Sequence, residues 1–189
     1  MNRGLTCATC WSGFPATRTA ASKSCCHTAG KSLRPDRPLT SSSRRIHVTG
    51  DDKPLTFVQA CQAAGLKTLL VSGGFTFFSE RIRARLALDF ARANMLEIVD
   101  GQLTGRLVPR PWGEIVDGAE KRRVLLEVAE LMGIAPEQAI AVGDGANDLP
   151  MMGVAGLSIA YHPKPAVLQQ AMLSITQGGM DRALSLLQA

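Results

Sequence analysis

The stretch Ala141-Val142-Gly143-Asp144-Gly145-Ala146-Asn147-Asp148-Leu149-Pro150-Met151-Met152 decides how the rest of the chain is interpreted. The apolar run at 139–142 is typical of a buried strand, and acidic and amide side chains follow it at once. In open α/β folds, ligands bind at the carboxyl ends of parallel strands, and carboxylate oxygens suit Mg²⁺. The alternative is an ordinary Asn/Asp/Gly turn. Because turns rarely need so many acids beside so apolar a strand, we expect a metal site here.

Patterns on both sides of this stretch alternate between helix and strand. The expected helices cover residues 57–64, 75–88 and 119–132, and the expected strands cover residues 67–71, 97–99, 103–108, 139–142 and 157–160. Asp100-Gly101 predicts a hairpin turn, and two further helical stretches are expected near the C-terminus. This alternation indicates an α/β fold, a Rossmann-like parallel sheet with flanking helices.

Charge and cysteine content divide the chain into a leader, residues 1–45, and a body, residues 46–189. The net charge of +5 comes from the leader, because the body has slightly more acidic than basic residues. A nucleic-acid partner is therefore not expected for the body. No apolar stretch is long enough to span a bilayer. With Cys61 the single cysteine of the body, we expect a cytoplasmic protein without a disulfide framework; the sequence does not indicate its oligomeric state.

Three interpretations compete for the leader, which has no sustained apolar periodicity. It is basic, rich in hydroxyl residues and poor in acids, as organellar transit peptides are. It could instead be a small zinc module that uses Cys7 and Cys10 with Cys25, Cys26 and His27, although adjacent cysteines fit one metal poorly. The interpretation that we favour is a segment unrelated to the fold, as a truncated or frameshifted product would carry.

A second polar loop is predicted at the same edge of the sheet. The strand ending at Val71 runs into Ser72-Gly73-Gly74 just before a helix, where hydroxyl and backbone N–H groups bind anions. Lys121 stands near the start of the helix at 119–132. Taken alone, such a lysine is usually a solvated surface charge. An edge that offers anion donors, a cation and metal ligands nevertheless suits phosphoryl transfer.

These segments resemble a known family. Val71-Ser72-Gly73-Gly74-Phe75, Lys121 and the stretch from Gly143 to Met151 are similar to the second, third and fourth motifs of haloacid dehalogenase-type phosphatases. The resemblance is strongest to phosphoserine phosphatases, whose hairpin and C-terminal segment are similar to residues 93–105 and 164–167. It covers roughly residues 50 to 189.

The resemblance implies a role for each motif residue. Asp144 would bind Mg²⁺, with Asp148 as a catalytic residue in the surrounding network. The Ser72 hydroxyl and the Gly73 N–H would bind the phosphate. The implied reaction is hydrolysis of phosphoserine to L-serine and phosphate through an aspartyl-phosphate, with one aspartate as acid and base. The binding and charge-neutralising residues implied are Ser72, Gly73, Lys121 and Asn147.

The family's first motif, Asp-x-Asp-x-Thr or Val, has no counterpart before Ser72. Asp36 stands between prolines, which oppose a central strand, and Asp51 and Asp52 are adjacent, so they would point to opposite faces. The usual cap region is also missing. We therefore expect a sheet incomplete at its N-terminal side, a vacant central position, a marginally stable monomer and negligible hydrolysis. The rival hypothesis is an inactive truncated or frameshifted remnant that binds phosphate or a protein partner; a weaker one is a leader that binds nucleic acid.

Overall fold

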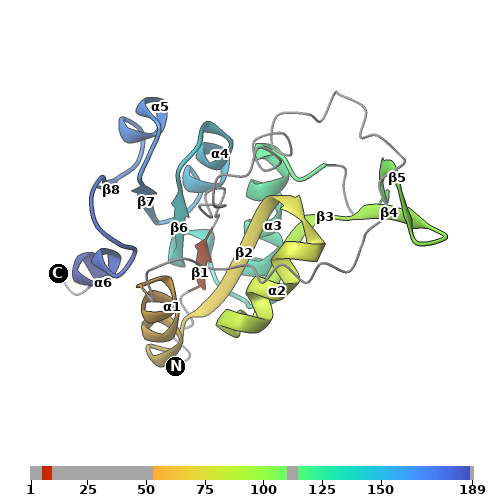
Figure 1. Cartoon of the computed structure of the whole chain (residues 1–189). Helices are drawn as coiled ribbons and strands as arrows, with labels where there is room; N and C mark the ends of the chain where they lie inside the picture. Colours follow the sequence, from red (N-terminus) through yellow and green to blue (C-terminus); the bar gives the residue numbers. More distant parts are fainter. Residues whose placement is uncertain (1–5, 10–52, 110–114, 188–189) are drawn as a thin grey trace.

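A parallel sheet forms the centre of the protein (Figure 1). The computed structural model describes residues 6–9, 53–109 and 115–187. Within them, the strands of this sheet are β1 Thr6–Thr9, β2 Lys67–Phe75, β3 Phe90–Asn94, β6 Ala139–Gly143, β7 Leu157–Tyr161 and β8 Leu173–Ile175. They lie in the order β3-β2-β1-β6-β7-β8, and every neighbouring pair is parallel. The predicted α/β class with a Rossmann-like sheet is confirmed.

Helices cover both faces of the sheet. The helices are α1 Lys53–Ala63, α2 Thr76–Leu86, α3 Gly118–Leu131, α4 Leu149–Met152, α5 Pro165–Leu168 and α6 Arg182–Leu187, with short 3-10 turns η1 Pro136–Gln138 and η2 Ala146–Asp148. Alternate strand residues point to opposite faces. Leu69 packs in one core with residues of α3, α4 and α5, whereas Leu70 packs in a second core with residues of α1 and α6. Among the described residues, no helix is long and apolar enough to cross a membrane.

A small hairpin stands apart from the sheet. Strands β4 Leu96–Val99 and β5 Gln102–Leu107 pair antiparallel and extend away from the main body in Figure 1. Asp100 and Gly101 connect them with positive φ angles of 51° and 76°. Both turn residues therefore adopt the left-handed conformation that an Asp-Gly hairpin turn requires. The predicted hairpin is confirmed.

Strand β1 occupies the centre of the sheet, so the expectation of a vacant central position is wrong. Thr9 is paired with Leu70 of β2 on one side and with Val142 of β6 on the other. The two inner strands would otherwise present unpaired N–H and C=O groups, and threonine favours strands. These four residues of the leader belong to the fold. The zinc interpretation also needs Cys10, Cys25, Cys26 and His27, which lie outside the described residues, and the boundary at residue 45 stays a prediction.

Besides β1, the sequence did not predict strands β3 and β8, and β2 is longer than predicted. β3 carries Arg92 and Asn94 among small and aromatic residues, so its pattern lacks the apolar run of an inner strand. β8 has three residues, which is too short for a pattern to show. β2 continues through the expected Ser72-Gly73-Gly74 loop to Phe75, with a register shift against β3. The predicted loop is therefore an irregular strand end.

Candidate active site

The two predicted polar loops lie at the same edge of the sheet. β2 and β6 are parallel and flank β1, so Ser72 and Asp144 both follow the buried parts of their strands at the carboxyl edge. The N-terminal end of α3, which carries Lys121, packs against η2 and α4 beside the Asp144 loop. The fold thus brings together the three motif segments, which lie far apart in the sequence.

Lys121 and Asp148 form an ion pair in the interior. Lys121 Nζ donates to Asp148 Oδ1 at 2.7 Å, and both residues have a relative exposure of 0%. The second carboxylate oxygen, Oδ2, accepts the backbone N–H groups of Asp144 and Gly145, each at 3.0 Å. Asp148 therefore shapes the loop that presents Asp144 and at the same time holds the lysine. The interpretation of Lys121 as a solvated surface charge is excluded.

The local sequence explains how each partner reaches this position. Asp117 caps α3, because its Oδ1 accepts the N–H of Glu120 at 2.9 Å. The N–H of Lys121 donates to the Asp117 carbonyl at 3.0 Å, which places the lysine at the end of the first turn. On the other side, Gly143 makes room for the acid: a Cβ there would lie 2.4 Å from the Cβ of Asp148. A glycine before Asp144 is therefore a steric requirement of the loop.

Asp144 is a half-buried carboxylate at the end of β6. Burial raises its pKa above the ordinary value, and the nearby Asp148 raises it further, while Lys164 and Lys121 oppose the shift. The backbone of the loop is also anchored, since the N–H of Lys164 donates to the Asp144 carbonyl at 3.0 Å. A carboxylate whose charge is disfavoured by its surroundings is one that a nearby cation stabilises.

The donor chemistry fits Mg²⁺. In the described part of the chain, no group of three or more His, Cys, Asp or Glu residues is arranged to hold a metal ion. Mg²⁺ is commonly bound through one or two carboxylates together with substrate phosphate and water. Asp144 supplies one such carboxylate, as the sequence predicted, and its role as a metal ligand remains a prediction.

The end of β2 offers a hydroxyl and a tight backbone. Ser72 Oγ accepts the N–H of Gly74 at 3.0 Å, which leaves its O–H available as a donor. The Gly73 carbonyl accepts Asn94 Nδ2 at 2.9 Å. A Cβ on Gly73 would lie 3.2 Å from the Val116 carbonyl oxygen, so two backbone segments approach closely here. These features are consistent with the predicted phosphate-binding roles of Ser72 and Gly73, which stay predictions.

Asn147 lies at the rim of the site. Its residue is exposed, in η2, while its backbone carbonyl lies 3.0 Å from the position of a Cβ on Gly118. The start of α3 therefore packs against the backbone of Asn147. Its predicted contact with substrate is not tested by this geometry.

Sequence reasoning missed Asn94 as a residue of the site. Asn94 is 7% exposed and contacts both the end of β2 and the segment before α3. The pair Ala93-Asn94 is part of the family resemblance, but its pattern alone does not single out the amide. Because β3 has no apolar pattern, the sequence offers no signal that would have identified Asn94 at the end of a strand.

A family model for haloacid dehalogenase-like hydrolases matches residues 28–153, more than half of the chain. The chain belongs to the haloacid dehalogenase-like hydrolases. This hydrolase chain is 65% identical over 129 residues to a phosphoserine phosphatase of Polaromonas sp. strain JS666, covering 68% of this chain and 55% of the relative. It is 44% identical over 132 residues to a phosphoserine phosphatase of Haemophilus influenzae, covering 70% of this chain and 41% of the relative.

Solved structures agree with the family and the fold. The hydrolase chain is similar to a probable phosphoserine phosphatase from Vibrio cholerae in unliganded form, with 41% identity and a TM-score of 0.64 over 69% of this chain and 39% of that chain. It is also similar to a substrate-bound phosphoserine phosphatase complex, with 35% identity and a TM-score of 0.64 over 70% of this chain and 61% of that chain. The chain spans about half the length of the curated relatives that it matches at 63–65% identity.

Proposed function

We propose that the chain acts as a phosphoserine phosphatase-like, Mg²⁺-dependent phosphomonoester hydrolase that releases L-serine and phosphate from phosphoserine. The observation that carries this proposal is the buried Lys121–Asp148 pair, whose second carboxylate oxygen holds the Asp144 loop. The phosphoserine phosphatases to which the chain is similar support the choice of substrate. We further propose that this reaction belongs to L-serine biosynthesis in the cytoplasm.

Each described residue has one role in this proposal. Asp144 would hold Mg²⁺, which would offset negative charge on the phosphoryl group. Lys121 would bring a second positive charge, kept in place by Asp148. The Ser72 hydroxyl and the Gly73 N–H would donate to phosphate oxygens, and Asn147 at the rim would contact the substrate.

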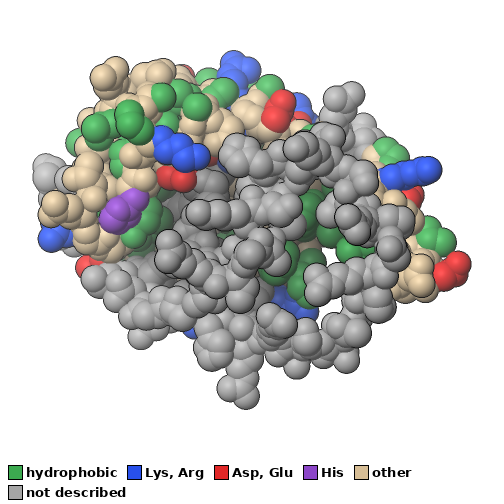
Figure 2. All heavy atoms as spheres, turned by 45° about the horizontal axis from the view of Figure 1, so that its top comes forward, with side chains coloured by type: hydrophobic (Ala, Val, Ile, Leu, Met, Phe, Trp, Pro, Cys, Tyr) green, Lys and Arg blue, Asp and Glu red, His purple; other side chains and the backbone are tan. Residues whose placement is uncertain are grey.

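The charge of the described residues on one face agrees with a small substrate. Among the coloured residues in Figure 2, the Lys and Arg side chains stand apart from one another, and some lie beside an acidic side chain. Nucleic-acid binding depends on clustered basic residues that contact successive phosphates. A small phosphorylated molecule needs a compact set of donors instead, as the ends of β2 and α3 would supply.

The proposal assigns no residue as the group that attacks phosphorus. In the family that the chain resembles, an aspartate of the first motif attacks phosphorus, and no Asp-x-Asp-x-Thr or Val precedes Ser72 in this sequence. The alternative hypothesis of an inactive remnant predicts phosphate binding without turnover. The relatives support the hydrolase over the remnant.

Phosphate release from phosphoserine by the full chain, with and without Mg²⁺, tests the proposal. The proposed function predicts Mg²⁺-dependent release that Asp144→Asn abolishes, whereas the missing first motif predicts negligible release. Asp100→Asn is the matched control, because it makes the same chemical change in the exposed hairpin turn and should leave the rate unchanged. Calorimetric binding of inorganic phosphate without any release would establish the remnant instead. A chain that neither binds phosphate nor releases it from phosphoserine would refute the proposed function.

A further inference from the structure

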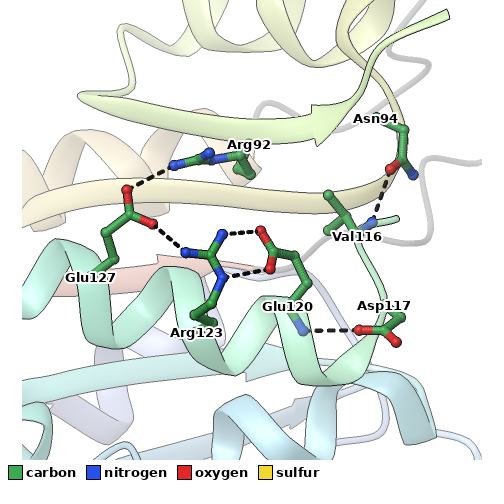
Figure 3. A network of polar contacts seen from close by, with 7 residues as sticks. All are labelled: Arg92, Asn94, Val116, Asp117, Glu120, Arg123 and Glu127. Carbon is green, nitrogen blue, oxygen red and sulfur yellow. Dashed lines mark hydrogen bonds and ion pairs between the residues drawn. The ribbon is translucent and has the colours of Figure 1, made fainter. Parts of the chain in front are cut away.

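Asn94 uses both ends of its side-chain amide to connect two parts of the site. Its Nδ2 donates to the carbonyl of Gly73 at 2.9 Å, at the end of β2. Its Oδ1 accepts the N–H of Val116 at 2.9 Å, in the segment that leads into α3, as Figure 3 shows. Asn94 is 7% exposed and Val116 is 6% exposed, so the bond between them is shielded from water.

The connection from Val116 to Lys121 is short and stiff. Val116 directly precedes Asp117, the capping residue of α3. The Asp117 carbonyl accepts the N–H of Lys121, so the capped first turn links Val116 to the lysine. Any displacement of Val116 therefore moves the start of the helix that carries Lys121.

The same bridge governs the spacing between two backbone segments. The Val116 carbonyl lies 3.2 Å from the position that a Cβ on Gly73 would take. Without the amide of Asn94, the Gly73 carbonyl and the Val116 N–H would both lose this partner. Gly73 is exposed, whereas the Val116 N–H is buried, and an unpaired buried group costs about 1–3 kcal/mol. Water would then compete for these groups, and the two segments could separate.

We propose that Asn94 is a positioning residue that fixes the phosphate-binding end of β2 relative to Lys121 at the start of α3. Its amide is suited to this task, since one side chain must donate to a carbonyl and accept from an N–H at once. Asn94 acts through Gly73 and Val116 and need not touch the substrate. The assignment of a phosphate to this place rests on the proposed function.

A second contact between β3 and α3 supplies a matched control. Arg92 Nη2 pairs with Glu127 Oε1 at 3.0 Å, and Figure 3 shows this pair farther along α3 than Val116. Arg92 and Asn94 lie two residues apart on β3, so they share a face of the strand. Glu127 lies about 9 Å along the helix from Lys121 at 1.5 Å per residue. Through Glu127, Arg92 therefore joins the same two elements at a point farther from Lys121 than Val116 is.

The test measures binding of inorganic phosphate to the full chain in the presence of Mg²⁺ by calorimetry. We expect Asn94→Ala to weaken phosphate binding about tenfold or more, from the loss of paired backbone groups. Arg92→Gln should change the affinity by less than about twofold, because its partner is exposed. Melting temperatures of both variants separate positioning from general stability. Equal phosphate affinity in wild type and Asn94→Ala would overturn the proposal.

Amide hydrogen exchange provides a readout that does not depend on a ligand. Asn94→Ala should speed exchange at Val116 and at residues 73–74, whereas Arg92→Gln should leave both unchanged. Asn94→Asp keeps the side-chain size and the acceptor for Val116 but loses the donor to Gly73, so it should fold if Asn94→Ala does not. In that variant we expect protection of Val116 to persist, exchange at residues 73–74 to increase and phosphate binding to weaken. Unchanged exchange at residues 73–74 in both variants would overturn the proposal.

These measurements distinguish the two proposals. If the wild-type chain binds no phosphate, the proposed function fails, and hydrogen exchange alone decides whether Asn94 holds the two segments together. If the wild-type chain binds phosphate and Asn94→Ala binds it equally well, the positioning role fails and the proposed function stands.

Discussion

Helix α3 carries two kinds of ion pair only two residues apart. Lys121 is paired with Asp148, and their side chains are 1% and 0% exposed. Arg123 is paired with Glu127 at 3.3 Å, and their side chains are 42% and 44% exposed. The inner pair also holds two backbone N–H groups of the Asp144 loop, whereas the outer pair makes further ion pairs with Arg92 and Glu120 (Figure 3). The inner pair is thus held in one geometry by its buried partners, whereas water can solvate the charges of the outer pair.

The difference follows from helix periodicity. Lys121 shares the inward stripe of α3 with Val124, Leu125 and Val128, which are all buried. Arg123 and Glu127 lie one turn apart on the outer side, where water competes for both charges. A charge on an apolar stripe needs a buried partner, and Asp148 is that partner.

The largest effect is expected from Asp148→Ala. This change leaves Lys121 buried without its carboxylate and leaves the N–H groups of Asp144 and Gly145 without their acceptor. Breaking a buried pair costs about 3–5 kcal/mol, so urea unfolding should show a loss in that range or no folded state at 25 °C. Glu127→Ala is the control on the outer pair. Similar losses in both variants would contradict the contrast between the pairs.

A smaller loss is expected from Lys121→Met. Methionine keeps much of the side-chain length but removes the charge, while Asp148 retains its two backbone donors. We expect a loss near about 3 kcal/mol, at the low end for a broken buried pair, together with loss of phosphate binding. Urea unfolding and calorimetry measure the two effects. Phosphate binding at the wild-type affinity would show that Lys121 serves the fold alone.

In the absence of Mg²⁺, Asp144→Asn should stabilise the folded protein, whereas the two preceding substitutions destabilise it. Burial and the nearby Asp148 raise the pKa of Asp144 in the folded state above its ordinary value of 3.8. A raised folded pKa contributes stability that is full below the unfolded pKa and is lost as pH rises through the folded pKa. At neutral pH, removing this charge should therefore raise the melting temperature slightly.

Mg²⁺ should favour the wild type over Asp144→Asn in melting temperature. A cation at Asp144 binds the folded state and should raise the melting temperature of the wild type. Asp144→Asn should gain little from Mg²⁺, and the difference between the two chains in scans with and without the ion is the measurement. An equal gain in both would remove Asp144 from the metal site.

The smallest effect is expected from Arg123→Gln. The Arg123 guanidinium is 42% exposed and pairs with the exposed Glu127 and with Glu120, whose side chain is 10% exposed. Glutamine keeps a hydrogen-bond donor for Glu120. Such pairs contribute about 0–1 kcal/mol and are screened by salt. Urea unfolding at low and high salt should show a loss within that range that shrinks with salt, and phosphate affinity should not change. A loss of unfolding free energy as large as that of Lys121→Met would contradict the difference between the inner and the outer ion pair.

The sequence predicted that the polar ends of two strands would lie at one edge of the sheet, and the structure places them there, while the roles of the site residues stay predictions. Asp144 directly follows β6, and Asp148 lies beyond it in η2. Lys121 could have been recognised as buried, because it shares the helical stripe of Val124 and Val128. Asn94 could not, since a single amide in a mixed edge strand has no periodicity, and its role depends on Gly73 and Val116 meeting in space.

Strand β1 was not predictable for a different reason. Thr6–Thr9 is too short for an alternating pattern, and it stands in a segment whose composition favours disorder. Its place is decided by what β2 and β6 need on their inner edges. Pairing with two distant strands overrides the local conformational preference of residues 6–9, and no local sequence pattern indicates such pairing.

The position of β1 sets the order in which the sheet can form. Its partners in the register lie roughly 60 and roughly 130 residues away along the chain, and such distant pairings slow folding because loop-closure entropy precedes the contact energy. Strand β1 is synthesised before both of its neighbours, and its second neighbour exists only when β6 has been synthesised. Nascent chains that end before residue 139 therefore hold β1 with at most one neighbour, and the sheet closes only late in synthesis.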